Sequence, residues 1–134
     1  MYDYEKMIAD DINQIANKEI YFQPDKILRE PDSIATDIIG KFVSWACRPQ
    51  NVLPISIARD CLKQFPTDWV SLKIKQTVFD SIDINDYWDY RRLLELSEII
   101  STDLLKWAIT LGEKSDDFDI IDAVDDYKER IQTC

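Results

Sequence analysis

The chain has 134 residues, of which 46% are apolar, 2 are glycine and 5 are proline, and its 16 lysines and arginines face 26 aspartates and glutamates, for a formal net charge of −10. This length and apolar content suit one domain over residues 1–134 that buries roughly two-thirds of its unfolded surface, and they exclude intrinsic disorder. Few glycines and prolines argue against a turn-rich β protein, no apolar run approaches the ~18 residues that cross a bilayer, and the negative charge disfavours contact with nucleic acid or anionic membranes.

The N-terminal part of the chain predicts one helix and an ordered connection. The helix covers about residues 4–18, where apolar side chains recur on one stripe at helical spacing. Pro24 and Pro31 stop helices on each side of the connection over residues 20–31. Apolar side chains in this connection need cover, so we expect an ordered wrap that packs on the rest of the chain.

The rest of the chain predicts six helices in three antiparallel pairs joined by short connections. The pairs are residues 32–46 with 53–64, 68–80 with 86–100, and 101–112 with 116–131. Asp32 or Ser33 can cap the first of these six helices. Ser101 or Thr102 can cap the fifth, and Gly112 is typical of its C-terminal end.

Three segments are similar at an interval of 35 residues. The sequence PTDWV at residues 66–70 is similar to STDLL at 101–105 and, more faintly, to PDSIA at 31–35. The apolar positions that follow also correspond, except that Lys73 interrupts the middle copy. Repeats of this length are typical of stacked helical hairpins, in which each unit buries its apolar face against its neighbours.

By this spacing the chain resembles HEAT-like αα-hairpin repeat proteins over about residues 31–131. The resemblance implies a curved stack of three antiparallel αα-hairpins, with the helix at 4–18 covering one end. It also implies binding of other proteins, without indicating a particular partner. The predicted fold class is therefore all-α, with about seven helices.

The chain lacks the residues that many kinds of catalytic site need. The chain has no histidine, which removes imidazole bases and ligands. Its two glycines, Gly40 and Gly112, are too far apart for a phosphate loop. Cys47 and Cys61 lie in apolar helical contexts and are expected to be buried free thiols, and with Cys134 they are too scattered for a zinc site. We therefore expect no cofactor and no metal.

The last predicted helix carries more aspartates than its start explains. Aspartates favour a helix N-terminus, but Asp122, Asp125 and Asp126 lie beyond the first turn. Asp119, Asp122 and Asp126 fall within about 60° of one another on the helical wheel, where like charges repel. A cationic partner would relieve that repulsion, and a solubilising face is the alternative.

The helix at 86–100 carries a second candidate surface. Trp88 shares a helix face with Arg92 and Glu95, close to Asp86 and Asp89. Tryptophan and arginine are enriched at binding hot spots, so this face suits a partner. In the alternative reading an adjacent hairpin covers Trp88, and Arg92 stacks on the ring as a cation–π pair.

These features favour a non-enzymatic protein-binding domain, active in a reducing cytoplasm, that captures a basic partner through an acidic surface. Immunity-type inhibitors of toxin and nuclease domains fit this description, because they are small and often acidic. Carboxylates placed where nucleic-acid phosphates would lie also speed association with a nuclease. The expected partner is thus a basic protein, with no direct nucleic-acid binding and no membrane, although an exposed Trp88 would also suit a homodimer.

Two other functions are open from the sequence. A helical-repeat adaptor or regulatory protein would bind a peptide in an aromatic groove. The third reading starts from two carboxylate pairs with members three residues apart, Glu95 with Glu98 and Asp119 with Asp122. This spacing is similar to the all-α nucleotide pyrophosphohydrolases, although Asp119 stands where that family has glutamate. The resemblance implies magnesium-dependent hydrolysis with these four carboxylates as metal ligands.

Overall fold

The computed structural model describes residues 3–48 and 50–132, and every regular element in them is a helix, as predicted. The helices are α1 (Tyr4–Ala16), α2 (Pro24–Leu28), α3 (Asp32–Cys47), α4 (Val52–Leu62), α5 (Thr67–Ser81), α6 (Tyr87–Ile100), α7 (Thr102–Gly112) and α8 (Phe118–Gln132). Eight helices rather than about seven occur in this part of the chain, because the connection over 20–31 contains the short α2. Pro24 begins α2, where its ring already holds a helical φ.

None of the helices in the described ranges is both long and apolar enough to cross a membrane.

Side chains cap the starts of α4, α6 and α7. Asn51 accepts a hydrogen bond from the Leu53 amide at 3.0 Å at the start of α4, and Asp86 accepts one from the Asp89 amide at 3.1 Å at the start of α6. Ser101 caps α7, as predicted. The expectation for α3 is wrong, because Pro31 occupies the cap position and no side chain there bonds a free amide.

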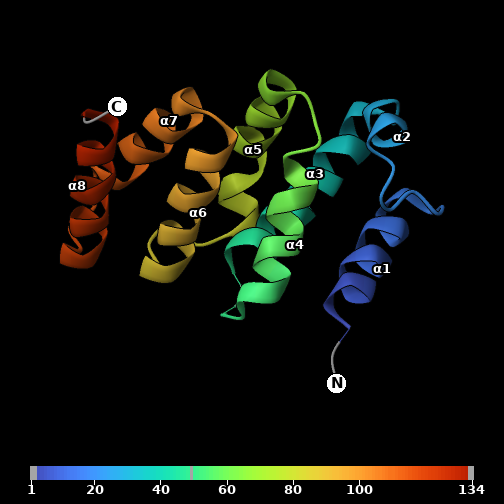
Figure 1. Cartoon of the computed structure of the whole chain (residues 1–134), viewed down its shortest axis with the longest axis horizontal. Helices are drawn as coiled ribbons and strands as arrows, with labels where there is room; N and C mark the ends of the chain where they lie inside the picture. The colour runs from blue at the N-terminus through green and yellow to red at the C-terminus, as the bar shows by residue number, and fades with distance from the viewer. Residues whose placement is uncertain (1–2, 49, 133–134) are drawn as a thin grey trace.

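The helices follow one another along the long axis of the molecule, from α1 at one end to α8 at the other (Figure 1). The central α3 packs against α1, α2, α4, α5 and α6, and α6 packs against α7 and α8. α4, α6 and α8 run in the same direction, so their first turns lie at the same edge, at the bottom of Figure 1. This shared edge brings together helix starts that are more than 30 residues apart in sequence.

The 35-residue interval of the sequence is also the interval between helix starts, since α3, α5 and α7 begin at residues 32, 67 and 102. Two of the expected pairs, α3–α4 and α7–α8, pack against each other, and α6 also packs on α7, with which the sequence did not pair it. α5, however, packs chiefly on α3 and makes few contacts with α6, with which the sequence paired it. The stack of three HEAT-like hairpins therefore stays a prediction.

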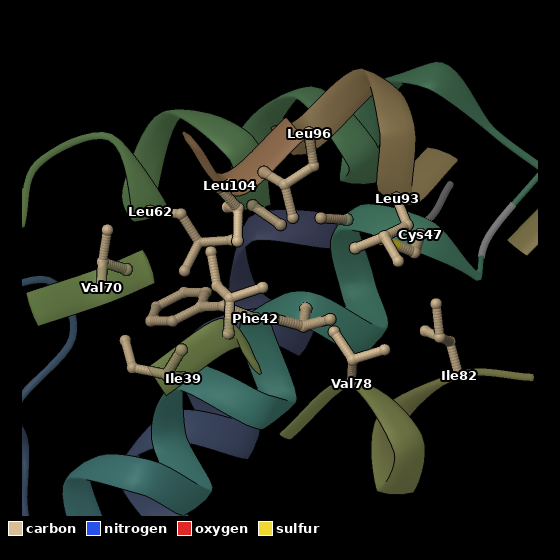
Figure 2. Packing of buried hydrophobic residues seen from close by; sticks show 14 of the residues in the cluster. Ile39, Phe42, Cys47, Leu62, Val70, Val78, Ile82, Leu93, Leu96 and Leu104 are labelled. Carbon is tan, nitrogen blue, oxygen red and sulfur yellow. The ribbon is translucent and has the colours of Figure 1, made fainter. Parts of the chain in front are cut away.

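The core is one apolar cluster to which most helices contribute. Figure 2 shows side chains from α3, α4, α5, α6 and α7 meeting in this cluster, including Phe42 of α3 and Leu96 of α6. Tyr21, Phe22 and Leu28 of the connection pack against it, and Ile27 is fully buried. The connection is therefore the ordered wrap that its apolar side chains predicted.

Lys73, which interrupts the apolar pattern of α5, is buried with its charge satisfied. Its side chain is only 4% exposed, and its ammonium group bonds the carboxylate of Asp32 and the hydroxyl of Thr36, the latter at 2.7 Å. The ammonium group also lies 5.8 Å from the centre of the Trp69 ring. A buried charge is tolerated when it is paired and hydrogen-bonded, so Lys73 links the middle of α5 to the start of α3.

Gly112 ends α7 for a reason other than the one the sequence indicated. No glycine in the described residues has a positive φ, so Gly112 does not provide a left-handed turn. A Cβ at this position would overlap the phenol of Tyr90 and come within 2.6 Å of a methyl group of Val124. Glycine is therefore required by the close approach of α6 and α8 to α7.

Cys47 and Cys61 are free and buried, as predicted. Burial raises the pKa of the Cys47 thiol to about 12 and that of the Cys61 thiol to about 11. Both thiols are thus protonated and unreactive at neutral pH. The prediction for Cys134 lies outside the described residues.

Candidate protein-binding surfaces

The joint before α6 is held together by its own aspartates. Asp86 caps the helix, Asp83 accepts a hydrogen bond from the Asn85 amide at 2.9 Å, and Asp89 accepts one from the Asp83 amide at 3.0 Å. The Asp89 side chain is only 13% exposed, and burial raises its pKa although the hydrogen bond from Asp83 acts in the opposite direction. Asp89 therefore holds the joint, whereas Asp86 caps α6 and remains exposed to solvent.

A cavity of about 540 Å³ opens between this joint and the turn after α3. Its lining residues are Arg48, Gln50, Asp83, Asp86, Trp88, Asp89 and Arg92. Four of the residues singled out in the sequence thus meet in one cavity. Arg48 and Gln50 join them only through the tertiary structure, with the Arg48 Nε 3.9 Å from Asp89.

Trp88 is exposed, so the alternative reading in which a neighbouring hairpin covers it is wrong. Its side chain is 58% exposed, and the edge of the Tyr87 ring approaches it at 5.0 Å between ring centres. The predicted cation–π pair is present, with the Arg92 guanidinium 5.6 Å from the ring centre. Arg92 thus supports one side of a tryptophan that otherwise faces solvent at the mouth of the cavity.

Glu95 lies in an ion-pair network and does not face solvent freely. It accepts hydrogen bonds from Arg92 at 2.9 Å and, across to α4, from Arg59 at 2.5 Å. Burial raises the pKa of Glu95, but the two guanidinium groups outweigh burial, and the pKa is lowered overall. Glu95 therefore orients Arg92, which in turn contacts Trp88.

The acidic face of α8, which we define as Asp119, Asp122, Asp125 and Asp126, is exposed along its length. Asp126 forms an ion pair with Arg91 of α6 at 3.2 Å. Across residues 3–48 and 50–132, no lysine or arginine forms an ion pair with the other three aspartates. Asp119, Asp122 and Asp125 are therefore not paired within the described residues, although Lys128 interacts electrostatically with Asp125.

The four carboxylates of the hydrolase reading are not assembled into a metal site. Glu95 is bound by Arg59 and Arg92, and Glu98 is bound by Arg130 at 2.8 Å. Asp119 and Asp122 are exposed to solvent on α8. Among the residues that the structure describes, no three acidic or cysteine side chains are grouped so that they could hold a metal ion.

Several residues of these surfaces were missed in the sequence. Phe118 is 91% exposed at the start of α8, and its helical spacing to Asp122 and Asp125 would have placed it beside the acidic face. Val52 and Leu53 are exposed at the start of α4. No local signal distinguishes these two from core residues of the same helix.

The structure thus defines an all-α protein whose exposed carboxylates and aromatic side chains form candidate protein-binding surfaces. Comparison with known proteins finds no family model that matches the chain, no similar curated protein and no similar solved structure.

Proposed function

We propose that the chain is a non-enzymatic protein-binding domain that captures a basic partner through the acidic face of α8. The sharpest form of this proposal is an immunity-type inhibitor of a cationic toxin or nuclease domain. The observation that supports it is the exposure of Asp119, Asp122 and Asp125, none of which forms an ion pair within residues 3–48 and 50–132, in a chain of net charge −10.

Charge on this face favours a fast encounter with a basic partner. Exposed carboxylates attract a cationic protein over about the Debye length, which is roughly 8 Å at physiological salt. Rim charges of this kind change the association rate more than the dissociation rate. The proposal therefore predicts strong salt dependence in the association rate constant.

The test measures association with a panel of purified cationic nuclease domains by biolayer interferometry. For any domain that binds, the triple variant D119N/D122N/D125N is expected to lower the association rate constant roughly tenfold at low salt. The matched control D68N/D80N/D103N changes the net charge equally, using exposed aspartates of α5 and α7 that form no ion pair within the described ranges.

Equal slowing by both triple variants would mean that net charge alone matters and that the acidic face has no special role. Association that is independent of salt would overturn the electrostatic account. Failure of every cationic domain to bind would argue against this class of partner.

A second candidate function, an adaptor that binds a peptide through aromatic contacts, is supported by the exposed Trp88 beside its cavity. An adaptor of this kind would show affinity that varies little with ionic strength. Trp88→Ala would then weaken binding more than changes at Asp122 and Asp126. The salt series on the wild-type chain therefore separates the two candidates.

A further inference from the structure

Exposed large apolar side chains are concentrated at three helix starts. The structure describes eight such residues: Met7, Val52, Leu53, Leu72, Phe79, Trp88, Ile99 and Phe118. Four of them occupy the first two positions of α4, α6 and α8. Scattered exposed apolar residues are ordinary. Here, however, half of the eight lie at the first two positions of only three helices, and this concentration needs an explanation.

These three helix starts lie at one edge of the molecule, because α4, α6 and α8 run in the same direction (Figure 1). Ion pairs tie the neighbouring helices together, Arg59 to Glu95 between α4 and α6 and Arg91 to Asp126 between α6 and α8. We define the helix-start surface as Val52, Leu53, Trp88 and Phe118. The 540 Å³ cavity opens beside Trp88, which lines it.

The same edge is negatively charged. Exposed aspartates precede or begin α6 and α8 at positions 83, 86, 116, 117 and 119, whereas Arg48 and Lys114 are the exposed cations of the adjoining turns. The aspartates have a structural explanation, because carboxylates cap helix starts and favour the positive end of the helix dipole. Neither capping nor the helix dipole favours an apolar side chain at these positions, and the apolar side chains would lose contact with water when a partner covers them.

We propose that the helix-start surface docks a partner segment whose apolar side chains are flanked by lysines and arginines. This inference rests on the proposed function, since it specifies the contact chemistry of the same basic partner. Trp88 and Phe118 supply the aromatic anchors, because aromatic residues are enriched at protein interfaces. The surrounding carboxylates match the partner's cations and would repel a second copy of this chain.

The experiment uses the full chain labelled with ¹⁵N and three helical peptides of equal length. One peptide combines lysine with leucine on an amphipathic pattern, one replaces the leucines with serine, and one replaces the lysines with glutamate. We expect the lysine–leucine peptide to bind most tightly, with the largest amide shifts at the starts of α4, α6 and α8. Phe118→Ala is expected to weaken this binding roughly tenfold.

Phe79→Ala is the matched control, because Phe79 of α5 is also exposed, at 59%, and lies outside the helix-start surface. Equal effects of the two variants, or shifts centred on α5, would overturn the inference. Equal binding of the lysine–serine peptide would show that the apolar side chains do not contribute, and it would overturn this inference. The proposed electrostatic capture of a basic partner would be unaffected by that result. Stronger binding of the glutamate–leucine peptide would instead count against the proposed basic partner.

Failure of the lysine–leucine peptide to bind at millimolar concentration would overturn the inference. The proposed function is tested separately, by association with the panel of nuclease domains. Sedimentation of the free chain tests whether a second copy of the chain occupies the helix-start surface instead. Self-association that Phe118→Ala abolishes would show that a second copy covers this surface, and it would also overturn the inference.

Discussion

Aromatic side chains occupy two contrasting regions of this molecule. Around α3, the ring of Phe22 meets those of Phe42 and Phe65 edge to face, each with 5.7 Å between ring centres, and Phe65 lies 5.3 Å from Trp69. At the starts of α6 and α8, in contrast, Trp88 and Phe118 face solvent. The first group joins the connection before α2, helix α3, the loop after α4, and helix α5, whereas the second contributes little to the core.

The position of each ring along its helix explains the difference. Side chains on a helix lean toward its N-terminus, so a residue in the first turn extends past the helix end, where no preceding turn covers it. Trp88 and Phe118 hold such positions. Phe42 lies in the middle of α3, with packing helices around it. Exposure of an aromatic residue here follows from its place in the helix, and this can be tested by substitution.

The largest expected effect on stability comes from the buried aromatic side chains around α3. Phe42→Ala removes a fully buried ring and should lower the free energy of unfolding by about 3–5 kcal/mol. Chemical denaturation followed by circular dichroism measures this change. Phe79→Ala, on an exposed ring, should change stability by no more than about 0.5 kcal/mol. Similar losses for the two variants would contradict the assignment of Phe42 to the core.

A smaller effect is expected where α6, α7 and α8 meet at Tyr90. Gly112→Ala places a methyl group against the Tyr90 phenol, which donates a hydrogen bond to the Ala108 carbonyl at 2.9 Å. Such overpacking should cost about 1–3 kcal/mol. Gly40→Ala is the control, because its Cβ would come no closer than 3.2 Å to any neighbour. Thermal unfolding should show the larger drop in Tm for the Gly112 variant.

The ion pairs of Glu95, which orient Arg92 against Trp88, should make the free energy of unfolding depend on pH. Because the pKa of Glu95 is lowered in the folded chain, its ion pairs stabilise the fold above the usual value of 4.5 and are lost as the pH falls through the lowered pKa. Glu95→Gln should therefore cost about 1 kcal/mol at pH 7 and less below pH 4. An identical loss at both pH values would show that the charge of Glu95 does not contribute.

The smallest effect on stability is expected for the exposed aromatic side chains at the starts of α6 and α8. Phe118→Ala should leave the free energy of unfolding within about 0.5 kcal/mol of wild type, since its ring is almost fully exposed. Urea denaturation of this variant, beside its peptide affinity, separates binding from folding. A loss of several kcal/mol would mean that Phe118 is part of the core and is no anchor for a partner.

Much of the candidate site was recognisable from residue type, but its assembly was not. Trp88 and Arg92 are four residues apart, so helical spacing sufficed to predict their stacking. The partner of Glu95 on α4, Arg59, is 36 residues away, and no local pattern indicates that contact. Phe118 was overlooked because the aspartates around it drew the interpretation toward charge alone.

The sequence by itself determined the helical class, most helix ends and the burial of Cys47 and Cys61, because helix periodicity, caps and apolar faces act within a few residues. The tertiary structure alone decided which helix starts share an edge, which carboxylates meet a guanidinium group and whether Trp88 is covered. These outcomes depend on the packing of helices distant in the chain, and the same amphipathic pattern is compatible with several packings. Exposure is therefore a property of the assembled molecule, whereas helix formation is largely a property of its segments.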